Sequence, residues 1–262
     1  MPLKTRLVLS CCLFAFCMSA AAQSIDTVRP GYAKLNPKAL QTGVHQYMVI
    51  MQRPHSNKTF FFWYWIREVR TGARNGVPVF NITQHWMGQD TSMYREIVSV
   101  NAQKDFSPIY HREIVRGKLS AYNWGPAGIT SADSVADNSK KDFALNFDAP
   151  NFNWNLDMET FEMLPLAEGK TFAINFYDAG LDVPKYVLYK VIGSEVIQTM
   201  DLQKVDCWKL FTTSEQNGST ATETFWISKK NHQFLKEEDA TPAMYRYKIR
   251  MPEGSPNPLE KL

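Results

Sequence analysis

The residue types that most often carry out catalysis or hold metals are scattered singly along this chain. Its five histidines, at positions 45, 55, 85, 111 and 232, lack the HExxH and HxH spacings of zinc sites. Ser194 lies in IGSEV, which lacks the flanking glycines of a GxSxG nucleophile elbow. No glycine-rich phosphate loop occurs. These patterns favour a non-catalytic protein that uses no metal and no other cofactor.

The densest acidic group near aromatic residues is Asp157, Glu159 and Glu162, in LDMETFEMLPL at 156–166. Paired carboxylates can hydrolyse a bond, but acids also favour the first turn of a helix. Because the apolar residues of this segment recur at helical spacing, it predicts a short helix that ends at Pro165. An unrecognised hydrolase stays a minor alternative, and it requires close carboxylates or a His–nucleophile pair in the folded chain.

The N-terminus has the three parts of a secretory signal peptide. Lys4 and Arg6 precede an apolar run from Leu7 to Met18, and Ser19-Ala20-Ala21-Ala22 supplies small residues for cleavage. The apolar run is shorter than the roughly 20 residues of a spanning helix. We expect cleavage after residue 22 and a mature chain of 23–262 in the periplasm or outside the cell. Lipidation at Cys11 or Cys17 is the alternative.

Removal of residues 1–22 leaves Cys207 as the single cysteine, so packing rather than a disulfide must hold the mature chain together. The formal charge of +3 falls to about +1, because Lys4 and Arg6 leave with the signal. A nucleic-acid-binding protein normally carries a basic excess on one face, so we expect no nucleic-acid partner. The mature chain has no further apolar stretch of spanning length, which predicts no transmembrane segment.

Most of the mature chain consists of short alternating runs that are rich in β-branched and aromatic residues and separated by Gly, Pro, Asn and Asp. This pattern predicts one all-β domain: a large curved antiparallel sheet or incomplete β-barrel, with one or two short helices. NPKAL at 36–40 is the second candidate helix, and the tail from Gly254 is expected to fray. Expected strands lie at 43–53, 60–70, 77–87, 93–102, 106–117, 118–125, 142–150 and 171–180, then at 185–193 and from Ser194 onward to the final YRYKI.

The run FFFWYWI, residues 60–66, interrupts this alternation with seven apolar side chains in a row. A strand that is apolar on both sides is expected to be covered on both faces. Two interpretations remain: a central strand in a filled core, or a strand whose concave side lines an apolar pocket. If a pocket exists, its candidate lining residues are Phe61, Trp63, Trp65, Tyr110 and Trp124.

Several segments resemble the bacterial secreted proteins of domain-of-unknown-function family 3108. They are SPIYHRE at 107–113, the helix that ends in Leu-Pro-Leu, and GKTFAINFYD at 169–178, followed by TFWIS and FL in the last hairpins. The resemblance covers about residues 43–251 and implies an exported antiparallel β protein, similar to the half-open barrels of lipoprotein carriers. The family implies no catalytic residues.

Together these observations predict an exported, non-catalytic protein that binds or carries a lipid or other apolar ligand. The alternative is a structural protein of the cell envelope with a filled core, which would recruit a protein partner by adding a strand to an exposed sheet edge.

Overall fold

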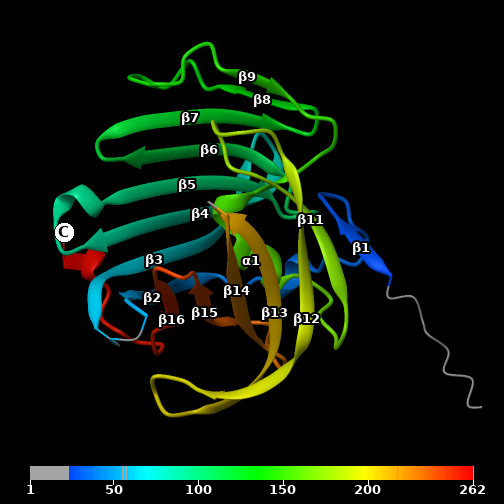
Figure 1. Cartoon of the computed structure of the whole chain (residues 1–262). Helices are drawn as coiled ribbons and strands as arrows, with labels where there is room; N and C mark the ends of the chain where they lie inside the picture. The colour runs from blue at the N-terminus through cyan, green and yellow to red at the C-terminus, as the bar shows by residue number, and fades with distance from the viewer. Residues whose placement is uncertain (1–23, 55, 57, 217, 262) are drawn as a thin grey trace, which may run out of the picture.

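The computed structural model describes residues 24–54, 56, 58–216 and 218–261; the proposed signal peptide lies outside them. Within these residues the chain forms one curved sheet of sixteen strands with a single α-helix, α1 (Asp157–Glu162), which confirms the all-β prediction (Figure 1). The strands of the first half are β1 (Ile25–Val28), β2 (Gly43–Gln52), β3 (Thr59–Arg74), β4 (Val77–Gly88), β5 (Arg95–Ala102), β6 (Pro108–Val115), β7 (Lys118–Gly125), β8 (Gly128–Ser131), β9 (Ala144–Asn146) and β10 (Phe152–Asn153). Those of the second half are β11 (Thr171–Tyr177), β12 (Lys185–Gln198), β13 (Lys204–Gln216), β14 (Ser219–Ser228), β15 (Phe234–Ala240) and β16 (Tyr245–Arg250). Short 3-10 turns are η1 (Pro37–Ala39), η2 (Thr91–Met93), η3 (Trp154–Leu156) and η4 (Pro258–Lys261).

Two antiparallel meanders make up the sheet, one from β2 to β9 and one from β11 to β16. They join where the last strand, β16, pairs antiparallel with β2, so that Tyr245 lies opposite Gln52 and Arg250 opposite Tyr47. At the other end of the sheet, the short strands β1 and β10 both pair parallel with β11. The outermost strands are therefore β1 and β9, with four and three residues. Short outer strands offer little free backbone to another chain.

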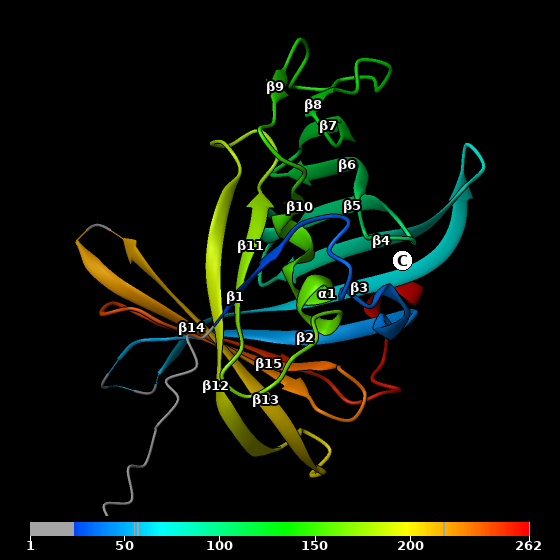
Figure 2. The ribbon, with the colours of Figure 1, turned by 90° about the vertical axis from the view of Figure 1, so that its right-hand side faces the viewer.

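The concave side of the sheet, called the inner face here, is filled by α1 and the segments around it. Figure 2 shows α1 in the angle between β11 and β12 on one side and β2 and β3 on the other. Phe161 of α1 lies between Tyr189 and Phe225, with ring centroids 4.8 Å away in each case. The helix is shorter than predicted, because the chain begins the segment as the 3-10 turn η3 and leaves the helix after Glu162.

The long strand β12 corrects one expectation from the sequence. Two runs, 185–193 and the one that begins at Ser194, were expected as separate strands, but they form a single strand of 14 residues. The register against β13 shifts between Val191 and Ser194, and Gly193 has a φ of 134°. A bulge of this kind lets a strand bend without ending. The second half of β12 therefore continues away from the sheet together with the start of β13.

Strand β3, which contains FFFWYWI, is covered on both faces only in part, whereas the sequence predicted full cover. Trp63 and Trp65 are buried on the inner face, but Phe60 and Phe62, on the outer face, are 43% and 39% exposed. Ile66 is buried on that outer face, beside Gln46 of β2. The C-terminal segment passes there, since Gln46 Nε2 donates to the Ser255 carbonyl and Met251 N–H donates to the Gln46 carbonyl. The tail is thus docked rather than frayed, and it covers the outer face only at this end of β3.

Gly180 lies two positions after the GKTFAINFYD segment, and its geometry disfavours any larger residue. It has a φ of 81°, and a methyl group there would lie 2.2 Å from the Tyr122 hydroxyl oxygen. We expect Gly180→Ala to lower the free energy of unfolding by about 2–3 kcal/mol, because left-handed strain and a steric clash act together. Urea unfolding measures this, and Gly254→Ala, with a φ of 83° and open space around it, isolates the backbone strain. Equal losses in the two variants would show that the clash is relieved at no cost.

Candidate functional site

The five residues that the sequence proposes for an apolar pocket do not share one site. Phe61, Trp63 and Trp65 follow one another on the inner face of β3, and the Phe61 and Trp63 rings are 6.1 Å apart. All three belong to, or pack against, the main core around α1. Trp124 lies in a second core cluster, where its ring is 5.4 Å from that of Tyr177. Tyr110 is on the outer face, under the guanidinium of Arg74.

A buried ion pair ties α1 to the inner face. Arg67 of β3 donates from Nε to Glu159 Oε1 at 2.8 Å, and its Nη2 forms a second bond with Oε2 of the same carboxylate. Arg67 Nη2 also donates to the Asn155 carbonyl at 3.1 Å. Glu162 accepts from the Phe234 backbone N–H at 2.8 Å. These two acids of the predicted cluster therefore hold the helix against the sheet.

A second set of charges lies on the inner faces of β14, β15 and β16, with Glu237 and Lys248 buried and Glu223, Asp239 and Arg246 half-buried. Glu237 accepts from both Lys248 and Arg246, and Arg246 also bonds Asp239. Burial alone would raise the pKa of Glu237, but the two cations outweigh it and lower the pKa to about 2. Burial and the adjacent Glu237 raise the pKa of Asp239 to about 8. Both cations are thus committed to carboxylates of the fold.

The hydrolase alternative required a His–nucleophile pair, and one exists on the inner faces of β5 and β6. The Ser99 hydroxyl is 3.1 Å from His111 Nδ1, but Asn153 Nδ2 also donates to that nitrogen at 2.9 Å. Ser99 and His111 have no exposed surface, and burial lowers the pKa of His111 to about 4. A serine nucleophile needs a base that faces both it and a substrate. This pair faces neither solvent nor a described cavity, so it serves the core.

A large concavity lies on the outer face, between the far half of the β12–β13 hairpin and the strands β14 to β16. This hairpin groove has a volume of about 1180 Å³. Its walls come from residues 195–206 of the hairpin, from 228–236 around the β14–β15 turn, and from 249–253 after β16. Figure 1 shows the hairpin turning away below the ends of β14 and β15. The bulge at Gly193 is thus the local cause of the groove.

The groove combines an apolar strip with a rim of charges. Its apolar lining residues are Val196, Ile197, Val205, Leu235, Ile249 and Met251. Five cations and four acids surround them, and some of these charges pair with each other, as Lys229 does with Asp206 at 2.9 Å. At the tip of the hairpin, Met200 and Leu202 are 46% and 73% exposed. The sequence signal for the groove is the apolar alternation that continues through Gly193, and the sequence-based site prediction missed it.

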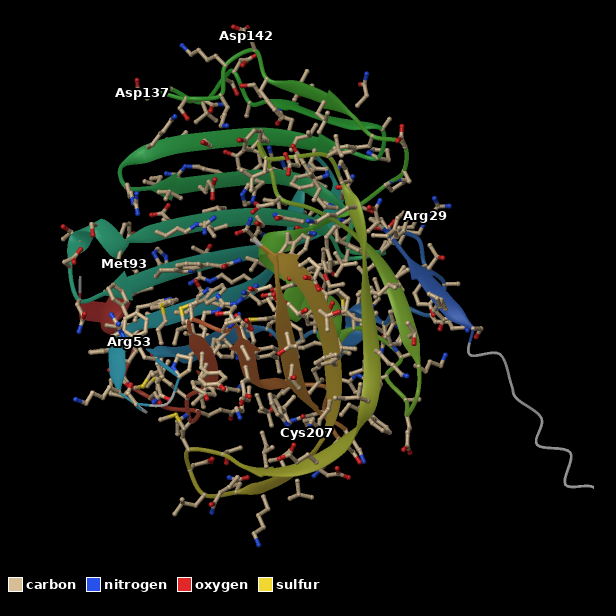
Figure 3. The ribbon with its side chains drawn as sticks, in the orientation of Figure 1. Arg29, Arg53, Met93, Asp137, Asp142 and Cys207 are labelled. Atoms are coloured by element: carbon tan, nitrogen blue, oxygen red, sulfur yellow. The ribbon has the colours of Figure 1, made fainter. Side chains whose placement is uncertain are left out.

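A small core cluster supports the base of the hairpin. Cys207, Trp226 and Leu235 are buried together, and Ile197 and Val205 pack against them. Figure 3 shows Cys207 near the foot of the sheet, above the hairpin turn. Burial raises the pKa of the Cys207 thiol to about 12, so the thiol is a packing group and not a nucleophile.

Within the described residues, no helix is long and apolar enough to cross a membrane, and no group of three or more His, Cys, Asp or Glu side chains could hold a metal ion. Comparison with curated proteins and with solved structures gives no match. Comparison with protein families matches residues 64–255 to "Protein of unknown function (DUF3108)". The match covers 192 of the 262 residues, including β16, both hairpin arms and α1. The chain therefore belongs to the DUF3108 family.

Proposed function

We propose that this is an exported, non-catalytic protein that binds a lipid or another amphiphile through its hairpin groove. The observation that carries the proposal is the groove itself. Its volume of about 1180 Å³ exceeds the range of roughly 300–1,000 Å³ that is common for small-molecule sites. A groove of this volume with apolar lining residues and a charged rim suits a molecule with an apolar chain and a polar head.

The hairpin tip supports this proposal independently of the groove volume. Leu202 is the most exposed of the large apolar residues described, and it has a φ of 64°, a conformation that a leucine adopts only at a cost. Met200, two residues earlier, is also exposed. An apolar tip beside a groove is a suitable entry for an amphiphile that leaves a membrane. We propose that the ligand enters at this end.

The inner face suits the same function less well. Its aromatic residues around Trp63 pack against the segments near α1, and its cations Arg67 and Lys248 are paired with Glu159 and Glu237. At the two ends of the sheet, strand addition would find only short strands, because β1 and β9 have four and three residues. The groove therefore carries the proposal.

A groove variant tests the proposal directly. Ile249→Glu places a carboxylate in the apolar strip, and we expect it to weaken binding of dansyl-aminoundecanoic acid at least about tenfold, or ~1.4 kcal/mol. The measurement is a fluorescence titration of the mature protein. Val77→Glu is the matched control, because Val77 is an exposed strand residue outside the groove.

Native mass spectrometry of protein purified from its own host gives the second readout. We expect an added mass that solvent extracts as lipid in the wild type and in Val77→Glu, and that is depleted in Ile249→Glu. Equal probe affinity in all three proteins, each shown to be folded by circular dichroism, would exclude the groove as the binding site.

A further inference from the structure

A second and smaller pocket lies at the other end of β12, far along the strand from the hairpin groove. It has a volume of about 230 Å³ and lies between η3, the end of β11 and the β11–β12 turn. Its lining includes Trp154, Phe176, Asp178, Leu181, Val183 and Lys185. A cavity of about 150 Å³ is enough to hold one benzene ring. The pocket therefore accepts one compact group, the size of a ring or of a small headgroup.

The floor of the pocket is aromatic. The rings of Trp154 and Phe176 have centroids 5.4 Å apart, and Phe176 is fully buried. Leu181 and Val183, from the β11–β12 turn, are 69% and 65% exposed beside it. Exposed apolar side chains around an aromatic floor lose water when a ligand with an apolar body covers them. This half of the pocket selects for hydrocarbon.

The other half of the pocket is acidic. Asp178 is mostly buried, and its carboxylate accepts a hydrogen bond from Asn155 Nδ2 at 3.1 Å. Arg95, whose positive charge acts on Asp178, is committed to Glu113 at 2.7 Å. Burial, and then the charge of Glu113, raise the pKa of Asp178, which is the mark of a carboxylate with too little positive charge around it. A ligand cation would supply that charge.

Lys185 already shows that the pocket attracts a cation. Its ammonium lies over the Trp154 ring, 5.6 Å from the centroid. Indole faces attract cations because of the ring quadrupole, and quaternary ammonium groups are bound in this way. Lys185 is an exposed residue on a flexible stem, so it can move aside. It is the group that a ligand cation would have to displace.

We infer that this pocket is a second binding site, specific for a cationic group with a compact apolar body such as a quaternary ammonium. Trp154 supplies the ring face, Asp178 the counter-charge, and Leu181 with Val183 the apolar rim. The site shares no lining residue with the hairpin groove, so it stands whether or not the groove binds an amphiphile.

Choline and its neutral isostere 3,3-dimethylbutan-1-ol are the probes that test the charge requirement. The measurement is an NMR titration that follows the indole N–H signals of the mature protein. We expect saturable binding of choline in the millimolar range and at least tenfold weaker binding of the neutral alcohol. Equal affinities, or no saturable shift with choline up to about 50 mM, would overturn the inference.

Two substitutions should act in opposite directions, which separates a ligand site from a general loss of structure. Asp178→Asn keeps the acceptor for Asn155 but removes the charge, and we expect choline to bind at least tenfold more weakly. Lys185→Gln removes the competing cation, and we expect about three- to tenfold tighter binding. Asp133→Asn, at an exposed turn, should leave the affinity unchanged. A Lys185→Gln variant that binds choline no tighter would contradict the inference.

Vesicles distinguish the two sources of such a group. Co-sedimentation with phosphatidylcholine vesicles but not with phosphatidylglycerol vesicles, lost in Asp178→Asn, would assign the ligand to a lipid headgroup. Binding of free choline without vesicle binding would assign it to a soluble molecule, and either result supports the site.

Discussion

Arg67→Met is expected to lower the free energy of unfolding by about 3–5 kcal/mol, the largest loss of any single substitution proposed for this protein. The change removes both bonds from Arg67 to Glu159 and leaves that carboxylate buried without a cation. Breaking one side of a buried ion pair costs far more than the pair contributes, because the remaining charge keeps its desolvation penalty. Urea unfolding, followed by circular dichroism and tryptophan fluorescence, measures the loss.

The double variant Arg67→Met, Glu159→Leu provides the control. Replacement of both charges by apolar groups of similar size is often nearly neutral, so we expect the double variant to recover most of the lost stability. If the loss in free energy of unfolding of the double variant equals the sum of the losses from the two substitutions made singly, the two side chains act independently. A single-variant loss below about 1 kcal/mol would mean that water reaches Glu159.

The second large effect is a fall in stability with rising pH that depends on Glu162. Burial raises the pKa of Glu162 to about 7 in the folded protein, against 4.5 for the ordinary group; the Phe234 N–H opposes this only in part. The folded state therefore binds the proton more tightly than the unfolded state between these two values. The protonated, neutral form of Glu162 is the one that the buried site favours. Its contribution to the free energy of unfolding is fully present below about pH 4.5 and is lost as the pH rises to about 7. At 1.36 kcal/mol per unit of pKa, the loss is about 3 kcal/mol.

Glu162→Gln isolates this contribution, because the amide oxygen can still accept from the Phe234 N–H. We expect the variant to match the wild type near pH 4.5 and to be about 3 kcal/mol more stable at pH 8. Urea unfolding at half-unit steps from pH 4.5 to 8 measures the difference. Glu168→Gln, at an exposed position, should show no such trend. A constant difference across the range would mean that Glu162 titrates alike in both states.

The strands of this fold and their assembly into a curved sheet are readable from the sequence, whereas the pairing of distant strands is not. Alternation in segments such as TFAINFYD is a local property, so β11 and most other strands lie where the pattern puts them. The pairing of β16 with β2 joins residues that are distant in the chain and leaves no local mark. The run FFFWYWI predicted that both faces of β3 are covered by other parts of the chain. Phe60 and Phe62 on the outer face nevertheless stay half exposed, because the C-terminal tail covers that face only near Ile66.

The candidate sites were less predictable, for the same physical reason. Aromatic residues in a strand are equally suited to a core and to the lining of a pocket. Here Trp63 and Trp65 belong to the core, because α1 packs against the inner face where they lie. The hairpin groove depends on one bulge at Gly193, which converts two expected strands into one long arm. The small pocket needs η3 and the end of β11 to meet, although Trp154 and Asp178 are 24 positions apart in the sequence.

The junction between β16 and β2 has a consequence for how the protein is made. Tyr245 must find Gln52, 193 positions earlier, before the sheet is continuous. Contacts of such high sequence separation form slowly, because the entropy of closing the loop is lost before the pairing compensates for it. During synthesis, the strands from β2 to β9 are complete long before β16 has been made. Until then, the edge of β2 that pairs with β16 has no strand partner. A chain cut short before residue 245 would keep that edge, and with it the tendency of unpaired strands to aggregate.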